Sequence, residues 1–482
     1  MTNDPSRLLL VASNRGPVSY ERGDDGSLTA KRGGGGMIAG LTSGLSAAAA
    51  DGGVLWLCTA LSDADRAAAR LGARATAHGE PAVRMLEIPA AVFEAAYNGI
   101  ANSVLWFVHH LLFDTPNQPR FDVEFRRDWS AYRSYNEAFA DALAQESVAD
   151  TRVLIQDYHL ALAPRLLRDR RPDARIAHFQ HTPWAPPEYY RMLPDEVAAA
   201  ILDGMLGADH AGFLAERWAS AFLDCCEAVL GARVMRGVGG GGRVSHRGRV
   251  TDVAVHPLGV DAAALRARAA EVDVRAAADT LAGLAGGRQL IVRIDRTELS
   301  KNIVRGLAAY RELLAARPEW RGKVTHLAFA YPSRSALAEY RAYTEQVHEL
   351  ARQINAEFGT PDWQPLVLEV KDDYPRSLAA NKIADVLLVN PTRDGMNLVA
   401  EEGPILSERG CALVLSREAG AAALIGDDAL LVNPYDVTAT AAALHTGLTM
   451  LPVDRRRRSA SITAAAQARA PQRWLAEQLD VL

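Results

Sequence analysis

The stretch VLLVNPTRDGMNLVAEE, residues 386–402, decides the fold of the second half of the chain. It begins as a β-branched, apolar run of strand length, and the spacing of Leu398, Val399 and Glu402 predicts a helix after the polar turn. We expect Asp394 to cap this helix and Gly395 to let the backbone approach a ligand. Free N–H groups at the carboxyl edge of a parallel sheet favour phosphate. An ordinary capped helix in a structural βα unit stays open as the alternative.

The length of 482 residues exceeds what one core supports, so two domains are expected. In both halves, apolar runs of strand length alternate with room for crossover helices, which predicts two doubly wound α/β domains. Pro257 and Gly259 mark the expected boundary, giving domains 1–257 and 258–463. A second glycine run, residues 239–242, is interpreted as part of a β-hairpin between Val244 and Val250.

Composition narrows the functional class. A formal charge of −5 and a pI near 6.2 give no sign of a nucleic-acid binder, and the arginine run 455–458 is interpreted as a solvated helix end. The four cysteines include no CxxC motif, which predicts neither a disulfide framework nor a zinc site. No apolar run is long enough for a signal peptide or a membrane span. We therefore expect a soluble protein of a reducing cytoplasm.

Two segments have a chemical and a plain structural interpretation. Asp63 and Asp65 form a DxD sequence of the kind that holds a divalent metal, but their place at a predicted helix start favours capping. The glycine run 33–36 opens a helical pattern and can present amides to an oxyanion, or it can be a flexible turn. His109 and His110 lie in an aromatic segment whose spacing predicts a helix in the core.

Polar residues follow several predicted strands. Asp157 and His181 end neighbouring strands of a βαβ unit and should lie at one sheet edge. Arg296 and Lys301 share one strand-to-helix turn, at the same edge as Asp394. Cations there can stabilise the negative charge that builds on a diphosphate when a sugar leaves it, at about 3 kcal/mol per group. The alternative is two cations on a solvated turn.

Together these residues resemble the trehalose-6-phosphate synthases, retaining glycosyltransferases. The resemblance covers nearly the whole chain and comprises, in order, SNRGP (13–17), GGxxxGL (35–41), QDYHL (156–160), HxP (181–183), HPLGVD (256–261), RxxxxK (296–301), SR (333–334), RDGMNLVAxE (393–402) and VNPYD (432–436). It implies two facing Rossmann-like domains of the GT-B type, with the active site in the cleft between them. It also implies that a C-terminal helix, residues 464–482, crosses back to the acceptor-binding first domain.

The resemblance assigns roles by position. It places the catalytic role on Arg296, Lys301, Asp157 and His181, the last touching the transferred glucose. Donor binding falls to Gly36, Arg296, Lys301, Asp394, Gly395, Met396, Asn397, Leu398, Val399 and Glu402, the last on the ribose. The acceptor, glucose 6-phosphate, falls to Arg15, Tyr97, Trp106, Asp157 and Arg334. The implied co-substrate is GDP- or UDP-glucose, with no metal or other cofactor, no nucleic acid and no membrane, and a homo-oligomer stays open.

The implied reaction retains configuration by front-face attack, without a covalent intermediate. A nucleophile mechanism needs a carboxylate on the face opposite the leaving group, whereas here Asp157 and Asp394 would bind substrate. The chain departs from the family pattern in WLCTAL (56–61), TPWAPPEYY (182–190) and Pro404 within the anchoring helix. Such departures occur in relatives that join cyclitols through nitrogen, so a pseudoglycosyltransferase is the second hypothesis. A non-catalytic nucleotide-sugar-binding regulator is the third.

The donor base is predicted from VKDDYPR, residues 370–376, where the family commonly has a polar-aromatic-Asp-Arg sequence. Guanine offers two neighbouring donors that one carboxylate accepts together, whereas uracil carbonyls would repel it. Asp372 and Asp373 therefore favour GDP-glucose, as in an actinobacterial GDP-glucose-using member of the family. The alternative is that both aspartates cap the following helix.

Overall fold

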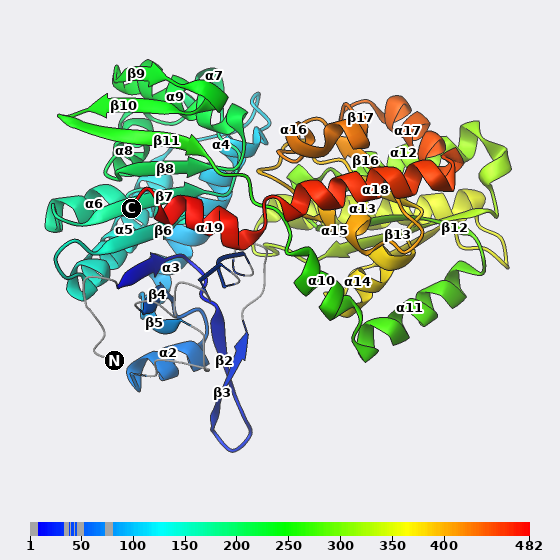
Figure 1. The fold of residues 1–482 in the computed structure, drawn as a ribbon, viewed down its shortest axis with the longest axis horizontal. Coiled ribbons are helices and arrows are strands. Elements are labelled where there is room, and N and C mark those ends of the chain that lie inside the picture. The colour runs from blue at the N-terminus through cyan, green and yellow to red at the C-terminus, as the bar shows by residue number, and fades with distance from the viewer. Residues whose placement is uncertain (1–7, 33–37, 39, 43, 46–52, 73–80) are drawn as a thin grey trace. The chain divides into compact units, whose positions relative to one another are not determined.

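The computed structural model describes residues 8–32, 38, 40–42, 44–45, 53–72 and 81–482. The chain divides into two compact units (Figure 1). The N-terminal unit is Met1–Leu258 with Pro471–Leu482, and the C-terminal unit is Gly259–Ala470. The return to the N-terminal unit thus comes at Pro471, where the sequence placed it at residue 464.

The N-terminal unit is built on a nine-stranded sheet, whose strand β1 has buried neighbours on both sides. In spatial order its strands are β5 (Ala82–Leu86), β4 (Val54–Thr59), β1 (Leu9–Ala12), β6 (Arg152–Gln156), β7 (Arg175–Gln180), β8 (His210–Phe213), β11 (Arg249–Val255), β10 (Gly242–His246) and β9 (Arg233–Arg236). From β5 to β8 this is the 3-2-1-4-5-6 order of a Rossmann sheet, and all these strands are parallel. The antiparallel β10–β11 pair confirms the hairpin predicted after the second glycine run.

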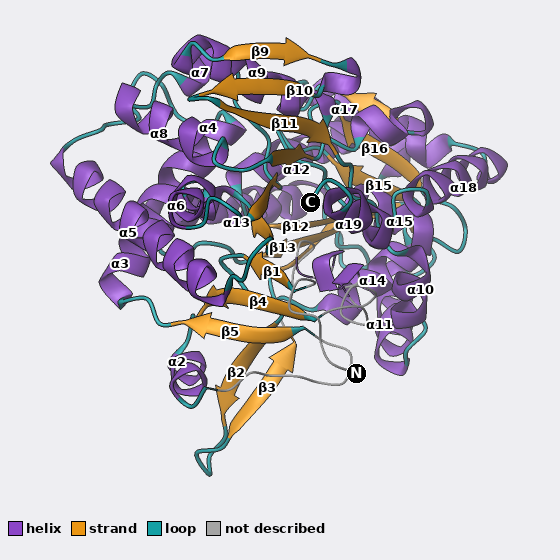
Figure 2. Ribbon diagram, turned by 60° about the vertical axis from the view of Figure 1, so that its left-hand side comes forward, coloured by secondary structure: helices purple, strands orange, loops and turns teal. Residues whose placement is uncertain are grey.

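Helices cover both faces of this sheet. They are α2 (Asp63–Arg70), α3 (Ala90–Glu94), the π-helix η2 (Ala95–Leu105), α4 (Trp106–His110), α5 (Val123–Glu146), α6 (Ala163–Arg170), α7 (Pro187–Tyr190), α8 (Asp195–Met205) and α9 (Glu216–Leu230), with 3-10 turns η3 (Tyr158–Leu160) and η4 (Val238–Gly240). The strands β2 (Val18–Arg22) and β3 (Leu28–Arg32) form a separate two-stranded ribbon (Figure 2).

Of the predictions about side chains in this unit, capping is confirmed for Asp65 but not for Asp63, and the burial of the histidine pair is confirmed. Ser62 caps α2, and its Oγ accepts from the Asp65 N–H while the Asp65 carboxylate accepts from the Ser62 N–H, which is a capping box. Asp63 pairs with Arg66 at 2.6 Å. His109 and His110 are buried, as a core helix requires.

The C-terminal helix α19 (Pro471–Leu479) belongs to the N-terminal unit. Its Trp474 is buried, and the indole ring meets the Phe179 ring edge-on at 5.0 Å between centroids. His181, which follows β7, lies 5.8 Å from the same indole. Burial of one tryptophan of this kind is worth several kcal/mol, so α19 is an integral part of this unit.

The C-terminal unit is built on a six-stranded, fully parallel sheet. Its strands in spatial order are β14 (Leu366–Glu369), β13 (Val324–Tyr331), β12 (Gln289–Arg296), β15 (Val386–Val389), β16 (Ala412–Ser416) and β17 (Leu430–Val432). This is again the 3-2-1-4-5-6 order, so the predicted pair of Rossmann-like domains is confirmed. The chain reverses its direction of travel across the sheet between β12 and β15, where ligands of such sheets bind.

The helices of this unit are α10 (Ala262–Ala269), α11 (Val272–Ala285), α12 (Ile303–Ala316), α13 (Ala338–Phe358), α14 (Tyr374–Ile383), α15 (Val399–Leu406), α16 (Ala422–Ile425), α17 (Val437–Thr449) and α18 (Pro452–Gln467), with 3-10 turns η5 (Leu299–Lys301), η6 (Pro318–Trp320) and η7 (Gly426–Asp428). Ile303, Leu307 and Tyr310 of α12 pack on the sheet in one apolar cluster with strand residues such as Ile291 and Leu388.

The arginine run at the start of α18 is not wholly solvated, contrary to the sequence interpretation. Arg455 is buried, and its Nη1 donates to the buried Asp385 Oδ1 at 2.9 Å. The other Asp385 oxygen accepts from the Leu290 N–H. The sequence alone does not show that Arg455 is buried, because its partner Asp385 lies 70 positions away.

We therefore predict that Arg455→Met lowers the free energy of unfolding by about 3 kcal/mol or more, because it leaves the Asp385 carboxylate buried without its cation. The matched control is Arg456→Met at the next, exposed position, which should stay within about 0.5 kcal/mol of the parent protein. Urea unfolding of the three proteins gives the comparison. Equal, small effects of both substitutions would show that the Arg455 pair does not stabilise the unit.

Candidate functional site

The turn between β15 and α15 differs from its prediction in one respect. Helix α15 begins at Val399, and no side chain caps its first turn. Asp394 does not cap it, because its Oδ2 instead accepts from Lys301 Nζ at 2.7 Å and from Asn397 Nδ2 at 3.2 Å. The long-range ion pair thus prevails over the local cap. Asp394 consequently does not block the amides at the start of α15, of which those of Ala400 and Glu401 donate to the Asn397 and Leu398 carbonyls. Uncapped amides at a helix start favour an anion.

Lys301 and Arg296 lie where the sequence placed them. β12 ends at Arg296, and Lys301 closes the 3-10 turn before α12. Because β12 and β15 are neighbouring parallel strands, the ends of both strands meet at one edge. The contact of Lys301 with Asp394 confirms that the two turns converge at this edge.

Glu298 is a residue of the candidate site that the sequence interpretation missed. It is fully buried, and its carboxylate lies 3.1 Å from Arg296 Nη1 and 3.7 Å from Arg334 Nη1. The Ser333 hydroxyl donates to its Oε1 at 2.9 Å. A carboxylate between two basic residues in RTELSK was the available signal. Glu298 orients Arg296, whose side chain is 56% exposed and so can reach a ligand.

The charges of this cluster reinforce one another. Burial alone would raise the pKa of Glu298, but the neighbouring Arg296, Arg334 and Lys301 cations and the Ser333 hydroxyl lower that pKa to about 2. Burial would likewise lower the pKa of Lys301, but the carboxylates of Asp394, Asp295 and Glu298 raise it. Both groups are therefore charged at neutral pH. A buried Arg293 pairs with Asp295 at 2.8 Å and donates to the Lys301 carbonyl, which supports the turn from below.

Glu402 lies in the first turn of α15 and is partly buried. Burial and then the neighbouring Glu401 raise the pKa of Glu402 to about 7. Its neighbour has a different function. Glu401 is fully buried, accepts from Arg469 Nη2 at 2.9 Å and from the Val260 N–H at 3.0 Å, and so fixes the inner face of α15. Glu402 itself makes no hydrogen bond or ion pair with the residues that the structure describes.

The two aspartates after β14, Asp372 and Asp373, have different surroundings. The Asp373 side chain caps α14 and accepts from the Arg376 N–H at 3.1 Å, as the alternative interpretation held for it. Asp372 is exposed and makes no hydrogen bond or ion pair with the residues that the structure describes.

The N-terminal unit gathers the other predicted residues at the ends of β1, β6 and β7. The Asp157 Oδ1 accepts from the His181 N–H at 3.2 Å, which confirms that the two share one edge. His181 Nε2 lies 2.7 Å from Gln156 Oε1, and burial and then His178 lower the pKa of His181 to about 3. His181 is therefore a neutral imidazole that hydrogen-bonds.

Arg15 and Tyr97 meet in the same unit. Arg15 is exposed, and its Nη2 lies 3.5 Å from the Tyr97 hydroxyl. The Tyr97 ring stacks on His159 at 5.6 Å between centroids. Trp106 is only 8% exposed and stacks on His110. Arg334 belongs to the C-terminal unit, where its Nη1 donates to the Tyr340 hydroxyl at 2.7 Å. Gly36 lies outside the described residues.

Strained backbone coincides with these positions. Seven non-glycine residues of the described chain have positive φ, and four of them are in the candidate site or next to it: Asp157, Asn302, Arg334 and Asn397. Such conformations cost about 1–3 kcal/mol each and cluster at functional sites. Their placement therefore supports the same two sheet edges as the charges do.

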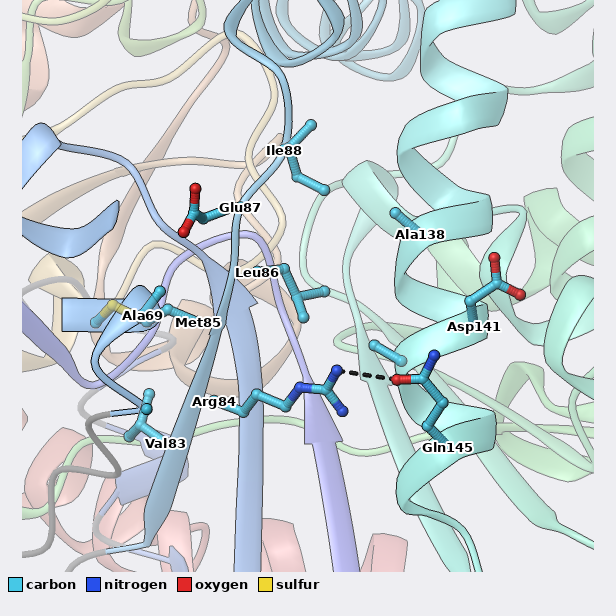
Figure 3. A pocket seen from close by; sticks show the side chains of 12 residues that line it. Ala69, Val83, Arg84, Met85, Leu86, Glu87, Ile88, Ala138, Asp141 and Gln145 are labelled. Atoms are coloured by element: carbon cyan, nitrogen blue, oxygen red, sulfur yellow. Dashed lines mark hydrogen bonds between the residues drawn. The ribbon is translucent and has the colours of Figure 1, made fainter. Parts of the chain in front are cut away.

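Several other features of the described residues lie outside the candidate site. A cavity of about 470 Å³ lies along β5 and α5, lined by residues such as Arg84, Glu87 and Gln145, and contains none of the predicted site residues (Figure 3). Within the described ranges, no group of three or more His, Cys, Asp or Glu side chains is placed to hold a metal ion. In the same ranges, each helix is too short or too polar to cross a bilayer. The four cysteines are buried free thiols.

Comparison with known proteins places these residues in a context. Residues 7–482 match the family model described as Glycosyltransferase family 20. The chain is 32% identical over 482 residues to a trehalose-6-phosphate synthase from Mycobacterium avium, covering 98% of this chain and 95% of the relative. It is 31% identical over 486 residues to validamine 7-phosphate valienyltransferase from Streptomyces hygroscopicus, covering 98% and 94%. An E. coli trehalose-6-phosphate structure bound with UDP-2-fluoro glucose superposes with a TM-score of 0.84 at 28% identity, covering 98% of both chains.

We predict that Glu298→Gln destabilises the protein in a pH-dependent way. The lowered pKa of Glu298 means that its contribution is complete above its ordinary value of 4.5 and is lost as the pH falls towards about 2. The difference from the parent should be about 3 kcal/mol at pH 7 and should shrink steadily below pH 4.5. Urea unfolding at several pH values measures it. A pH-independent difference would contradict the charged cluster, and exposed Glu319→Gln serves as the control.

Proposed function

Because the chain belongs to glycosyltransferase family 20, we propose that it transfers glucose from a nucleoside-diphosphate glucose to glucose 6-phosphate, giving α,α-trehalose 6-phosphate. The observation that carries this proposal is the charged cluster at the end of β12, where Arg296 and Lys301 accompany the uncapped start of α15. The similarity to the M. avium synthase supports the product. The E. coli structure bound with UDP-2-fluoro glucose supports a nucleotide-sugar donor.

On the donor side, the departing diphosphate is the group that needs stabilisation. Negative charge builds on its β-phosphate as the glycosidic bond breaks, and fixed cations stabilise that charge without reorganising. Lys301 is held charged and in place by Asp394, and Arg296 by Glu298. Backbone amides of residues 395–399 bind the phosphates, and Glu402 accepts from the ribose hydroxyls.

On the acceptor side, the phosphate dianion of glucose 6-phosphate needs charge-assisted partners. Arg15 and Arg334 supply them, and Tyr97, Trp106 and Asp157 bind the rest of the acceptor. His181 contacts the transferred glucose as a neutral hydrogen-bonding group, in keeping with its lowered pKa.

Retention follows from attack on the same face as the leaving group. The acceptor hydroxyl attacks the anomeric carbon beside the departing phosphate, and its proton passes to a phosphate oxygen as the C–O bond to that phosphate breaks. A covalent route would need a free carboxylate on the opposite face. Asp394 is paired with Lys301, and Asp157 accepts from the His181 N–H, which supports binding functions for both. No metal takes part in this mechanism.

A second candidate is transfer of a nucleotide-activated cyclitol to an amino-cyclitol phosphate through nitrogen. The similarity to validamine 7-phosphate valienyltransferase favours it almost as much as the synthase identity favours glucose transfer. Pro404 within α15 is a further departure from the usual family pattern. The same diphosphate cluster serves both reactions, so the acceptor decides between them.

We predict that nucleoside diphosphate is released from GDP- or UDP-glucose when glucose 6-phosphate is added, and not when glucose is added, because glucose lacks the phosphate that the acceptor cations bind. Release should continue in EDTA. A coupled assay for nucleoside diphosphate, with product identified by mass spectrometry, tests this. Release with validamine 7-phosphate alone would establish the second candidate, and loss in EDTA with rescue by Mg²⁺ would contradict the metal-free mechanism.

We propose guanine as the donor base and Asp372 as the carboxylate that accepts from it. Asp373 is occupied by the cap of α14, whereas Asp372 is exposed at the end of the β14 turn. One carboxylate can accept from both the guanine N1–H and the 2-amino group. A bidentate match is worth about 1–3 kcal/mol of discrimination.

In competition at equal concentrations, we predict that GDP-glucose is used at least about tenfold faster than UDP-glucose. Asp372→Asn should lower this ratio, whereas Asp373→Asn should leave the ratio unchanged. Product analysis after partial conversion gives the ratio directly. Preferential use of UDP-glucose would overturn the proposal, and unchanged selectivity in Asp372→Asn would remove its proposed cause.

A further inference from the structure

Tyr374 is an aromatic residue that the packing of the C-terminal unit leaves half exposed. It is the first residue of α14, directly after the Asp373 cap, and 51% of it is exposed to solvent. Single exposed aromatic residues are ordinary on protein surfaces. Here the ring lies at the carboxyl edge of the C-terminal sheet, where the strands end and ligands of such sheets bind.

The ring is contacted from helix α10. The Arg268 guanidinium of α10 lies 5.9 Å from the ring centroid, and Arg268 is itself fixed by Asp273 at 2.7 Å. Burial raises the pKa of the Tyr374 hydroxyl, and the carboxylate of Glu402 on α15 raises it further. Helix α14 packs against both α10 and α15, so Tyr374 and Glu402 stand in the first turns of two neighbouring helices.

Hydrogen bonds hold the turn that carries the ring. The Tyr331 hydroxyl, at the end of β13, donates to the Asp373 carbonyl at 3.2 Å. Arg376 of α14 donates to Glu369 at the end of β14 at 2.6 Å. A platform fixed in this way loses little conformational entropy when a ligand settles on it.

These groups follow the order of the parts of a nucleotide. Lys301 and the start of α15 are the phosphate end, and Glu402 comes one turn into α15 at the ribose. Tyr374 is the aromatic residue at the start of the neighbouring helix α14, and Asp372 lies two residues before it. A nucleoside diphosphate bound at the first two positions brings its base to the third.

We propose, on the basis of the proposed function, that Tyr374 is the platform on which the base of the sugar-nucleotide donor stacks. Every base has a flat π-face, so stacking adds affinity without reading the base. Asp372 reads the hydrogen-bonding edge of the base. Affinity and selectivity are thereby separated between two residues, and the larger face of a purine gains more from the tyrosine than a pyrimidine does.

The test uses the full chain and free ligands. Isothermal titration with GDP, UDP and inorganic pyrophosphate is compared for the parent protein, Tyr374→Ala and Tyr374→Phe, and thermal unfolding verifies folding. Tyr374→Ala should weaken GDP binding about tenfold or more, weaken UDP binding less, and leave pyrophosphate binding within about twofold. Tyr374→Phe keeps the ring and should bind all three ligands as the parent does.

Three results would overturn the proposal: unchanged GDP binding in Tyr374→Ala, an equal loss for GDP and pyrophosphate, or a Phe variant as weak as the Ala variant. The last would show that the hydroxyl acts, and not the ring. Failure of the proposed function is recognised separately. A parent protein that binds GDP through Tyr374 but releases none from GDP-glucose with glucose 6-phosphate would refute the reaction and leave the platform standing.

Discussion

The ion pair between Lys301 and Asp394 is the interaction on which the site of the C-terminal unit depends. It joins two turns that follow neighbouring strands, β12 and β15, and both side chains are about 15% exposed. Either charge alone would destabilise the unit, because removal of one partner from a buried pair leaves the other charge uncompensated. The pair also keeps the Asp394 carboxylate off the start of α15. One contact therefore fixes the cation and leaves the helix terminus open to an anion.

The rest of the site extends from this pair by charge. Glu298 repeats the arrangement on the other side of the turn, because it is buried and holds Arg296 and Arg334. On α15, Glu401 accepts from Arg469 and from the Val260 amide and so anchors the helix, whereas Glu402 makes no hydrogen bond or ion pair with the described residues. Asp373 and Asp372 divide in the same way between a cap and a free carboxylate. In both pairs of neighbouring acidic residues, one carboxylate is bound to the protein's own groups, namely Glu401 and Asp373.

Sequence reasoning predicted what local patterns determine. The strands are apolar, largely β-branched runs, which favour buried strands over other structures. Their alternation with helices predicted parallel sheets, and hence a common edge for Arg296, Lys301 and Asp394. It was wrong about the Asp394 cap and about Arg455, and it missed Glu298. All three errors concern charge pairs, two of which join residues 93 and 70 positions apart. The preference of Asp for a helix cap can be predicted from neighbouring residues, whereas the cation that binds Asp394 instead is brought there by tertiary folding.

The account's central claim is that Arg296 and Lys301 stabilise a departing diphosphate. The most direct measurement is steady-state turnover of Arg296→Ala and Lys301→Ala with a nucleotide-glucose donor and glucose 6-phosphate, with folding verified by thermal unfolding. Arg311→Ala, an exposed cation on α12 paired with Glu357, is the matched control. We predict that each site variant loses about 100-fold or more in turnover while the control is unchanged. Near-normal turnover in folded site variants would contradict the claim and make both residues ordinary surface cations.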